Sequence, residues 1–426
     1  PDGLALQPVQ RWSYDGIGEV VSATDAQGGV TDYVHDSLGR LARQVDPLVS
    51  GEAERGAVRY TYDDAGNVVE AVDQVGARQT ATYDDLNRRV TSTDIVRQGG
   101  GEPDRFTTTS TYDDQGNVTS TKNAAGAVTT FEYSALQELT RQIDELGQAT
   151  TIVRDVAGRP TSVTDPLGRV ERLLYDAAGR TVETQQIDAG GQVVERHRNG
   201  FDANGNITSA TTPNGTTTTY DYDAGGRLSA VHVPKSASEV MTTTFGYDLN
   251  DNMTAMVDGR GNTTRYGYNS WDLASQIVEE ATPTAPQLAE RTYTVAYDSL
   301  GRPDRESQPG NVAIGRSYDA LGRVTEVVGT APATATAKKS FTYDLVGNLT
   351  SIDHPGGTVG YTYDDRRQLT GTSGAGGVSA YTYDAVGRLT ERSDATGTTT
   401  MSYTARGELE RLDDPLTATS ITYSYD

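Results

Sequence analysis

The sequence predicts an all-β protein, a continuous antiparallel meander of hairpins that coils into a spiral, hollow β-shell or part of one. Three observations support this class. A Tyr-Asp-x-x-Gly motif recurs along the 426 residues, mostly at steps of 20 to 22 residues. A second Asp-x-x-Gly follows most copies about ten residues later. Between these turns, aromatic and polar residues alternate, and no window has helical spacing of apolar residues over three turns.

The motif has the chemistry of a tight hairpin turn. Asp favours the first position of a type I turn, and Gly suits the left-handed fourth position of a three-residue hairpin loop. One clear copy, at 381–389, reads Tyr-Thr-Tyr-Asp-Ala-Val-Gly-Arg-Leu. The clearest copies of the structural motif are Tyr62, Asp63 and Gly66; Tyr112, Asp113 and Gly116; Tyr175, Asp176 and Gly179; Tyr318, Asp319 and Gly322; Tyr343, Asp344 and Gly347; and Tyr383, Asp384 and Gly387 with Arg388.

Weaker copies test the same interpretation. Asn87, Asp251 and Asp272 replace the glycine, and Asn and Asp tolerate the left-handed region best after Gly. Gln137 and Arg367 are poorer substitutes, so we expect strain or another turn type there.

The second turns complete the repeat. Asp63 is followed by Asp73, and the segment 165–168 reads Asp-Pro-Leu-Gly, with Pro where type I turns favour it. Each repeat therefore holds two strands and two reversals. About 18 repeats give about 36 strands of roughly six residues, and a ribbon on the order of 170 Å wide must coil or close.

Some steps between motif copies are longer, and these longer steps mostly begin at every second copy of the motif. The extra residues fall at the second turns, in segments 95–105, 188–195, 234–239, 280–290 and 330–338. Insertions in one turn of a repeat emerge on one edge, so we expect these loops to line one rim on every second hairpin. From Tyr343 onward the spacing tightens and the insertions cease.

Composition narrows the class further. Hydrophobic residues make up 35%, with 24 Tyr but only 5 Phe, which favours a thin wall over a thick core. The net charge of −23 disfavours nucleic acid and anionic membranes as partners, and no apolar run could span a membrane. Cysteine is absent. We expect residues 1–426 to be a single repeat region, a fragment of a longer shell without a catalytic or toxin domain.

The sequence offers no catalytic, cofactor-binding or metal-binding residues that we would assign. The four histidines are scattered, and His35 replaces a motif Tyr. Asp248-x-Asn250-x-Asn252 begins like a calcium loop but lacks its Gly and its bidentate Glu. Paired acids such as Asp63-Asp64 recur at turns, whereas a catalytic pair has no reason to repeat. We therefore expect a non-enzyme.

The motif from Tyr383 to Leu389 resembles the YD repeat of the RHS family, and the resemblance covers essentially the whole chain. The family includes Rhs polymorphic toxins, the BC component of insecticidal Tc toxins and teneurins. The resemblance implies a β-sheet spiralling into a hollow cocoon, which in the bacterial toxins encloses a C-terminal toxic domain. The family's Asp-Pro-x-Gly-Leu self-cleavage motif closes the shell, whereas 165–168 lies mid-chain and fits an ordinary turn.

Two functions are therefore expected from different classes. The first is the structural wall of a secreted or cell-surface cocoon, whose partner is a C-terminal toxin cargo of the same polypeptide. Its inner face should then carry few exposed Leu or Ile. The alternative is an extracellular module that binds carbohydrate or a cell-surface protein through the rim loops, although the Tyr residues stand where a core would use them.

Overall fold

The computed structural model describes residues 10–49, 53–98, 101–236, 238–281, 290–332, 334–335, 338–417 and 419–425. These residues form 38 strands in one antiparallel sheet and contain no helix, so the predicted fold class is confirmed. No membrane-spanning helix exists among them.

The strands of the first part of the ribbon are β1 (Arg11–Tyr14), β2 (Val20–Thr24), β3 (Val30–His35), β4 (Leu41–Val45), β5 (Ala57–Tyr62), β6 (Val68–Val72), β7 (Arg78–Tyr83), β8 (Arg89–Val96), β9 (Asp104–Tyr112), β10 (Val118–Lys122), β11 (Val128–Tyr133), β12 (Leu139–Ile143), β13 (Ala149–Arg154), β14 (Pro160–Thr164), β15 (Val170–Tyr175), β16 (Thr181–Ile187), β17 (Val193–Phe201), β18 (Ile207–Thr211) and β19 (Thr217–Tyr222). The remaining strands are β20 (Leu228–Pro234), β21 (Val240–Tyr247), β22 (Met253–Val257), β23 (Thr263–Tyr268), β24 (Ala274–Glu279), β25 (Arg291–Tyr297), β26 (Pro303–Gln308), β27 (Val312–Tyr318), β28 (Val324–Ala331), β29 (Thr334–Ala335), β30 (Lys339–Tyr343), β31 (Leu349–His354), β32 (Gly357–Tyr363), β33 (Leu369–Gly374), β34 (Gly377–Tyr383), β35 (Leu389–Asp394), β36 (Gly397–Tyr403), β37 (Leu409–Asp413) and β38 (Ile421–Thr422).

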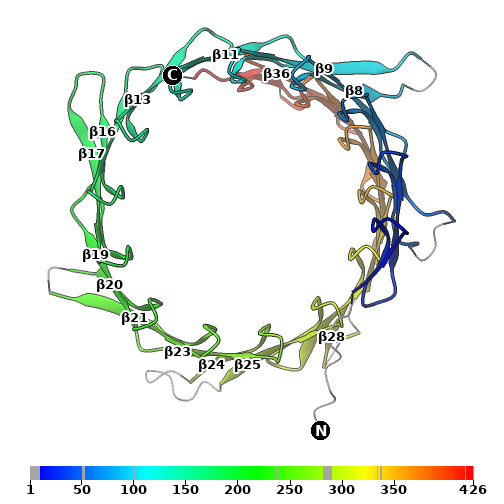
Figure 1. The fold of residues 1–426 in the computed structure, drawn as a ribbon. Helices are drawn as coiled ribbons and strands as arrows, with labels where there is room; N and C mark the ends of the chain where they lie inside the picture. Colours follow the sequence, from blue (N-terminus) through cyan, green and yellow to red (C-terminus); the bar gives the residue numbers. More distant parts are fainter. Residues whose placement is uncertain are drawn as a thin grey trace.

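Within the described residues each strand pairs with the next along the chain except β29, because β28 pairs with both β29 and β30. Within the described residues β1 pairs only with β2 and β38 only with β37, so the sheet is an open ribbon. Figure 1 shows this ribbon winding into a ring around a wide lumen and then running on past its own start. We call residues 10–281 the first coil and residues 290–425 the second coil.

The wall is one sheet thick. The protein exposes 25480 Å², whereas a compact protein of its mass, 45.5 kDa, exposes roughly 16,000 Å². No large side chain of the described residues is less than 2% exposed. In β5, Tyr60 and Tyr62 are half-buried on one face while Thr61 between them is exposed, as the alternation predicts. Stability therefore comes from neighbouring strands rather than from a central core.

The YD turns have the predicted left-handed geometry. Gly66 has φ 91°, and its amide donates to the Asp63 carbonyl over 3.1 Å. Asn87, Asp251 and Asp272 adopt the same region, with φ between 58° and 68°. Gln137 (φ 63°) and Arg367 (φ 62°) form the same turn as the others, so another turn type is not used at these two positions.

The second turns change along the chain. At Gly76 and Gly168 they repeat the Asp-x-x-Gly geometry. After Tyr343 they shorten to two-residue hairpin loops: His354 pairs with Gly357, and the next two hairpins close in the same way. Asp394 and Gly397 are therefore paired strand ends rather than the ends of a three-residue loop.

Three of the insertions form hairpins that leave the ring. Figure 1 shows the hairpins β8–β9, β16–β17 and β20–β21 extending outward from the wall. The segment 280–290 lies largely outside the described residues. These three hairpins lie at second turns, as expected, but they project away from the wall.

Candidate functional site: the YD clasps and the seam between coils

The Asp of each YD turn holds its loop closed. One oxygen of Asp63 accepts the Asn67 amide over 2.8 Å, and the other accepts the Asn67 side-chain amide over 3.0 Å. These bonds, led by the side-chain bond, hold the pKa of Asp63 below its usual range. The pKa of Asp113 is lowered by the equivalent bonds from Asn117. The same closure occurs at the other predicted turns, Asp176, Asp319, Asp344 and Asp384.

The motif Tyr joins each repeat to the preceding one. Tyr62 donates its hydroxyl to the Leu41 carbonyl over 2.8 Å, and Tyr343 does the same to Val324 over 2.8 Å. Burial raises the pKa of both phenols. Equivalent bonds are made by Tyr112 to Arg89, Tyr175 to Pro160, Tyr318 to Pro303 and Tyr383 to Leu369. The tyrosines thus have a structural role in the wall, and these hydroxyl bonds could not be predicted from the repeat motif alone.

An Arg after the turn adds a second link, this time to the following repeat. Arg323 bonds Asp319 of its own turn at 2.6 Å and donates to the Asp344 carbonyl over 2.7 Å. Its guanidinium also stacks 4.9 Å from the centre of the Tyr343 ring. Arg388 repeats this arrangement with Asp384, the Thr404 carbonyl and the Tyr403 ring. We call this Asp–Arg–Tyr unit the YD clasp.

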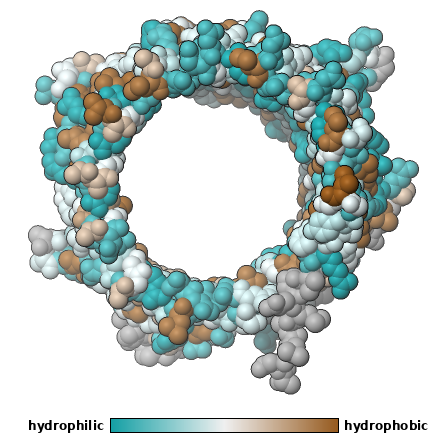
Figure 2. Space-filling model, in the orientation of Figure 1, coloured by the Kyte–Doolittle hydropathy of each residue, from teal (hydrophilic) through white to brown (hydrophobic). Residues whose placement is uncertain are grey.

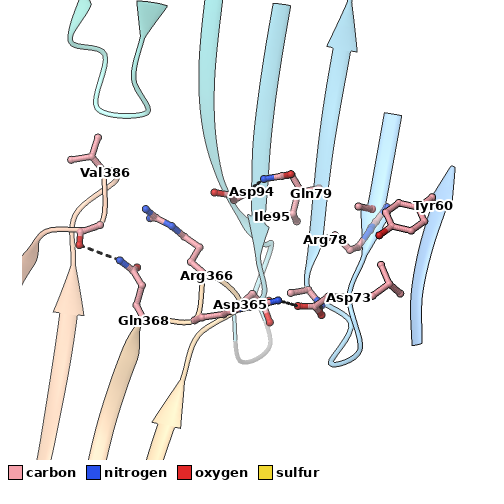
Figure 3. A pocket seen from close by; sticks show the side chains of 15 residues that line it. Tyr60, Asp73, Arg78, Gln79, Asp94, Ile95, Asp365, Arg366, Gln368 and Val386 are labelled. Carbon is pink, nitrogen blue, oxygen red and sulfur yellow. Dashed lines mark hydrogen bonds and ion pairs between the residues drawn. The ribbon is translucent and has the colours of Figure 1, made fainter. Parts of the chain in front are cut away.

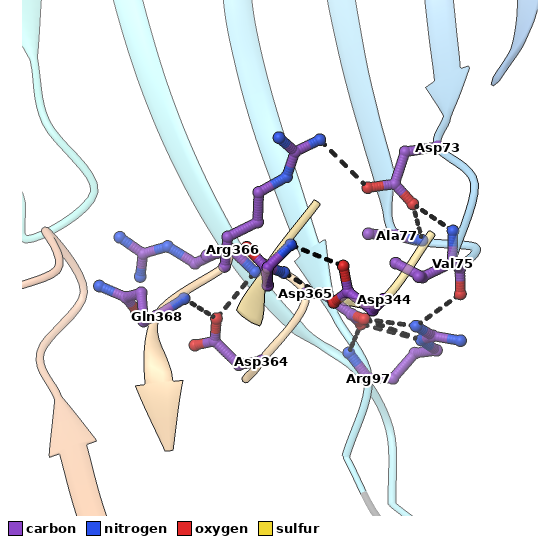
Figure 4. A network of polar contacts seen from close by, with 11 residues as sticks. Asp73, Val75, Ala77, Arg97, Asp344, Asp364, Asp365, Arg366 and Gln368 are labelled. Carbon is purple, nitrogen blue, oxygen red and sulfur yellow. Dashed lines mark hydrogen bonds and ion pairs between the residues drawn. The ribbon is translucent and has the colours of Figure 1, made fainter. Parts of the chain in front are cut away.

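The two coils meet along a seam. Hydrogen bonds join second turns of the first coil to YD turns of the second coil at points that lie 258 to 271 residues apart. Arg97 donates its backbone amide and guanidinium to Asp365, and Arg406 pairs with Asp144. Gln27 reaches Asp298 over 3.3 Å. Figure 4 shows the polar network of this seam around Asp73 and Asp365.

The electrostatics of the seam favour the ionised partners. Hydrogen bonds from the Arg97 side chain and amide hold the pKa of Asp365 below its usual range. Burial acts to raise the pKa of Asp144, but bonds from the Gln148 amide and Arg406 outweigh it and the net pKa is lowered. At neutral pH both carboxylates therefore remain charged opposite arginine.

A cavity of about 560 Å³ lies on this seam (Figure 3). The first coil contributes Tyr60, Gln79 and Asp94, and the second coil contributes Arg366 and Val386. Gln79 donates to Asp94 over 2.8 Å, and Arg366 stacks 4.4 Å from the Phe106 ring. The first contact joins neighbouring strands of the first coil, and the second joins the two coils.

The remaining candidate positions are ordinary turns. The Asn252 side-chain amide donates to Asp248 over 3.2 Å, as that of Asn67 does to Asp63. The Asn206 side-chain amide donates to Asp202 over 2.8 Å in the same way. The turn at 165–168 closes with the Gly168 amide on the Asp165 carbonyl. In the described part of the chain, no group of three or more His, Asp or Glu could hold a metal ion.

Comparisons with known proteins agree with this architecture. The RHS repeat family model matches residues 14–48, 112–151, 154–193 and 201–237, and the teneurin YD-shell model matches residues 285–426. Together these matches span more than half of the chain. The chain belongs to the RHS/YD-repeat family.

Solved shells of this kind share the fold. The crystal structure of TcdB2-TccC3-TEV matches with a TM-score of 0.72 at 15% identity, covering 96% of this chain and 27% of that chain. The Photorhabdus luminescens Tc holotoxin pore matches with a TM-score of 0.69 at 15% identity, covering 95% and 28%. The YD-repeat chain thus spans about a quarter of these relatives and has the fold of a Tc toxin shell.

One curated relative carries a toxin's name. The double-stranded DNA deaminase toxin A of Burkholderia cenocepacia (strain H111) is 42% identical over 83 residues, which are 20% of this chain and 6% of that protein.

Proposed function

We propose that residues 1–426 form one repeat region that serves as the structural wall of a β-cocoon. The cocoon encapsulates a C-terminal toxin cargo of the same polypeptide in a secreted or cell-surface protein. The observation that carries the proposal is the single-layered ribbon winding around a wide lumen. On this proposal the wall itself is non-catalytic and acts by enclosing its cargo.

The distribution of apolar side chains supports this role. Among the described residues, the exposed Leu and Ile side chains lie mainly at turns and loops. The ones on strands are Leu174, Ile207 and Ile421. Neither face of the sheet therefore presents a continuous row of exposed Leu and Ile. Such a row would bind an unfolded cargo tightly and hinder its release. Figure 2 shows a visible surface that is mostly hydrophilic, with separate apolar spots.

Mild proteolysis of the native protein that contains this region tests the proposal. We expect the repeats to resist protease and to retain a separate C-terminal fragment until denaturation, as intact masses would show. A C-terminal segment that is digested at the same rate as an isolated peptide would overturn encapsulation.

The projecting hairpins favour a second candidate function, an extracellular binding module for carbohydrate or a partner protein. Val193 and Val194 of β17 and Val240 and Met241 of β21 are exposed on the hairpins that leave the wall. Glycan-array or cell-surface binding that is lost when these hairpins are shortened, with the fold intact, would support the module. Binding that survives shortening would exclude these hairpins as the site.

A further inference from the structure

The two faces of the sheet differ in chemistry. One face carries the motif tyrosines. The residue before each motif Tyr points to the other face and is often a hydroxyl residue, as at the exposed Thr61, Thr82 and Thr342. The hydroxyls of Thr82 and Thr91 lie 2.7 Å apart in a hydrogen bond between neighbouring strands. We call this surface, whose side chains alternate with the motif tyrosines, the hydroxyl face.

The hydroxyl face lies on the outside of the wall. Hairpin β8–β9 leaves the ring outward (Figure 1) and still contacts the second coil, because Arg366 of that coil stacks on the Phe106 ring of β9. Phe106 stands six residues before the motif Tyr112, so it lies on the tyrosine face. The second coil belongs to the ring, and the hairpin therefore turns its tyrosine face inward and its hydroxyl face outward.

Two arginines stand side by side on the hydroxyl face. Arg43 of β4 and Arg59 of β5 are direct partners in the register of these strands, and both are exposed. Residues so placed have Cβ atoms about 5 Å apart, and like charges at this spacing destabilise a sheet. We call these two residues the arginine pair.

The carboxylates beside the arginine pair are already engaged. On the same face Asp32 pairs with Arg55, and Glu70 pairs with Arg78. Within the described residues the arginine pair thus has no carboxylate partner, and four arginines share two carboxylates. This local excess of positive charge stands out in a chain whose net charge is −23. Such a patch attracts an anionic ligand.

A second group of arginines occupies the same face farther around the ring. Arg172 of β15, Gln185 of β16 and Arg196 of β17 are successive partners in register, so they share one face. Arg172 is exposed. Arg196 and Arg198 share one carboxylate, Glu183, at 2.9 and 2.8 Å. Two arginine groups on one open face suit a long ligand that carries anions at intervals.

We propose that the arginine pair anchors an acidic polysaccharide on the outside of the wall. Guanidinium groups donate to a carboxylate in a fixed fork, and two of them here face the same space. The exposed Thr61 hydroxyl and the 49% exposed Val34 flank the pair and suit the hydroxyls and the C–H surface of a sugar. Widely spaced anions fit better than nucleic acid, because the net charge of −23 repels a dense polyanion.

This inference rests on the carbohydrate-binding candidate above and places the site on the wall instead of on the hairpins. Calorimetric titration of the full chain with hyaluronan oligosaccharides, which carry one carboxylate per disaccharide, tests it. We expect a Kd in about the micromolar to millimolar range that weakens with added salt. Dextran oligosaccharides of equal length carry no charge and should not bind. Absence of hyaluronan binding, or equal binding of dextran, would overturn the proposal.

Matched variants locate the site. The double variant Arg43→Gln with Arg59→Gln should weaken hyaluronan binding by about tenfold or more. The control Arg141→Gln removes an arginine of the same face that pairs with Glu132 over 2.9 Å, and it should change binding by less than about threefold. Equal loss in both would overturn the arginine pair as the anchor.

Stability separates binding from a structural role of the arginine pair. The double variant removes two like charges that face each other, so its midpoint of unfolding by denaturant should not be lower than that of the parent. A lower midpoint would mean that the two arginines support the sheet, and it would overturn the assignment.

Shortened hairpins separate the wall site from the hairpin candidate. A chain without the tips of β16–β17 and β20–β21 keeps the arginine pair and should bind hyaluronan like the parent. Binding that is lost in this chain but kept in the double variant would overturn the wall site and leave the hairpin candidate standing.

Discussion

Replacing Arg323 by Ala perturbs the most buried of the YD clasps. The Arg323 side chain is 14% exposed and its partner Asp319 is 3% exposed. Arg169 and Asp165 form the same ion pair in the same turn, but these side chains are 62% and 31% exposed. Arg169→Ala is therefore a control in which the same ion pair is exposed and is not joined by the carbonyl bond and the ring stacking that Arg323 adds.

The structure sets the expected magnitudes. Arg323→Ala removes the pair, the bond to the Asp344 carbonyl and the stacking on Tyr343, and it leaves Asp319 buried. Removing one partner of a buried pair costs about 3 to 5 kcal/mol. Asp319 keeps its bonds from the Leu321 and residue-323 amides, so we expect about 3 kcal/mol. The exposed pair should contribute less than about 1 kcal/mol.

Hydrogen exchange measures this effect locally, because each strand depends mainly on its neighbours. Arg323→Ala should speed exchange in β27, β28 and β30 by roughly 100-fold, at about 1.4 kcal/mol for each factor of ten. Arg169→Ala should change exchange in β14 and β15 by less than about tenfold. Equal effects of the two variants, or no effect of either, would refute the role assigned to burial of the clasp.

Three further predictions concern turns, pH and the seam. Gln137→Gly should stabilise its hairpin by roughly 1 kcal/mol, and Gly66→Ala should destabilise its hairpin by about 1 to 2 kcal/mol. Unfolding by denaturant measures both changes, and the opposite signs would contradict the left-handed conformation of these residues. The lowered pKa of Asp63 and similar turn carboxyls contributes stability that is full above the ordinary carboxyl pKa of 3.8 and is lost as pH falls through the folded-state value. The melting temperature should therefore decrease as the pH is lowered below about 4. A melting temperature that stays constant down to about pH 2.5 would count against these bonds. Arg97→Ala removes the guanidinium that pairs with Asp365 and leaves only the backbone amide bond. Small-angle scattering should therefore show the second coil separating at lower salt than in the parent, and unchanged scattering would exclude this ion pair as a tie between the coils.

The hairpin architecture could be predicted because its signals are local. The Asp-x-x-Gly pattern defines each turn within five residues, and Asn87 and Asp251 show the same left-handed requirement that Gly meets elsewhere. Gln137 and Arg367 show the limit of that reasoning. Their turns retain the Asp-type closure and the flanking ladder, which fix the conformation despite the less favourable residue.

The clasps and the seam could not be predicted in the same way, because they join residues that are distant in sequence. The Tyr62 hydroxyl bond spans 21 residues, and the Arg97–Asp365 pair spans 268. The sequence does carry a signal for the Tyr62 contact, because an Arg of one repeat, Arg40, recurs at a regular distance before the Tyr of the next repeat, on which it stacks. The second depends on how many repeats complete one coil, which the repeat spacing does not set.

Cryo-electron microscopy of the native protein that contains this region tests the central claim most directly. The account predicts a closed wall of YD repeats with density inside the lumen that belongs to the C-terminal part of the same polypeptide. An empty lumen, or a C-terminal domain folded outside the wall, would contradict it.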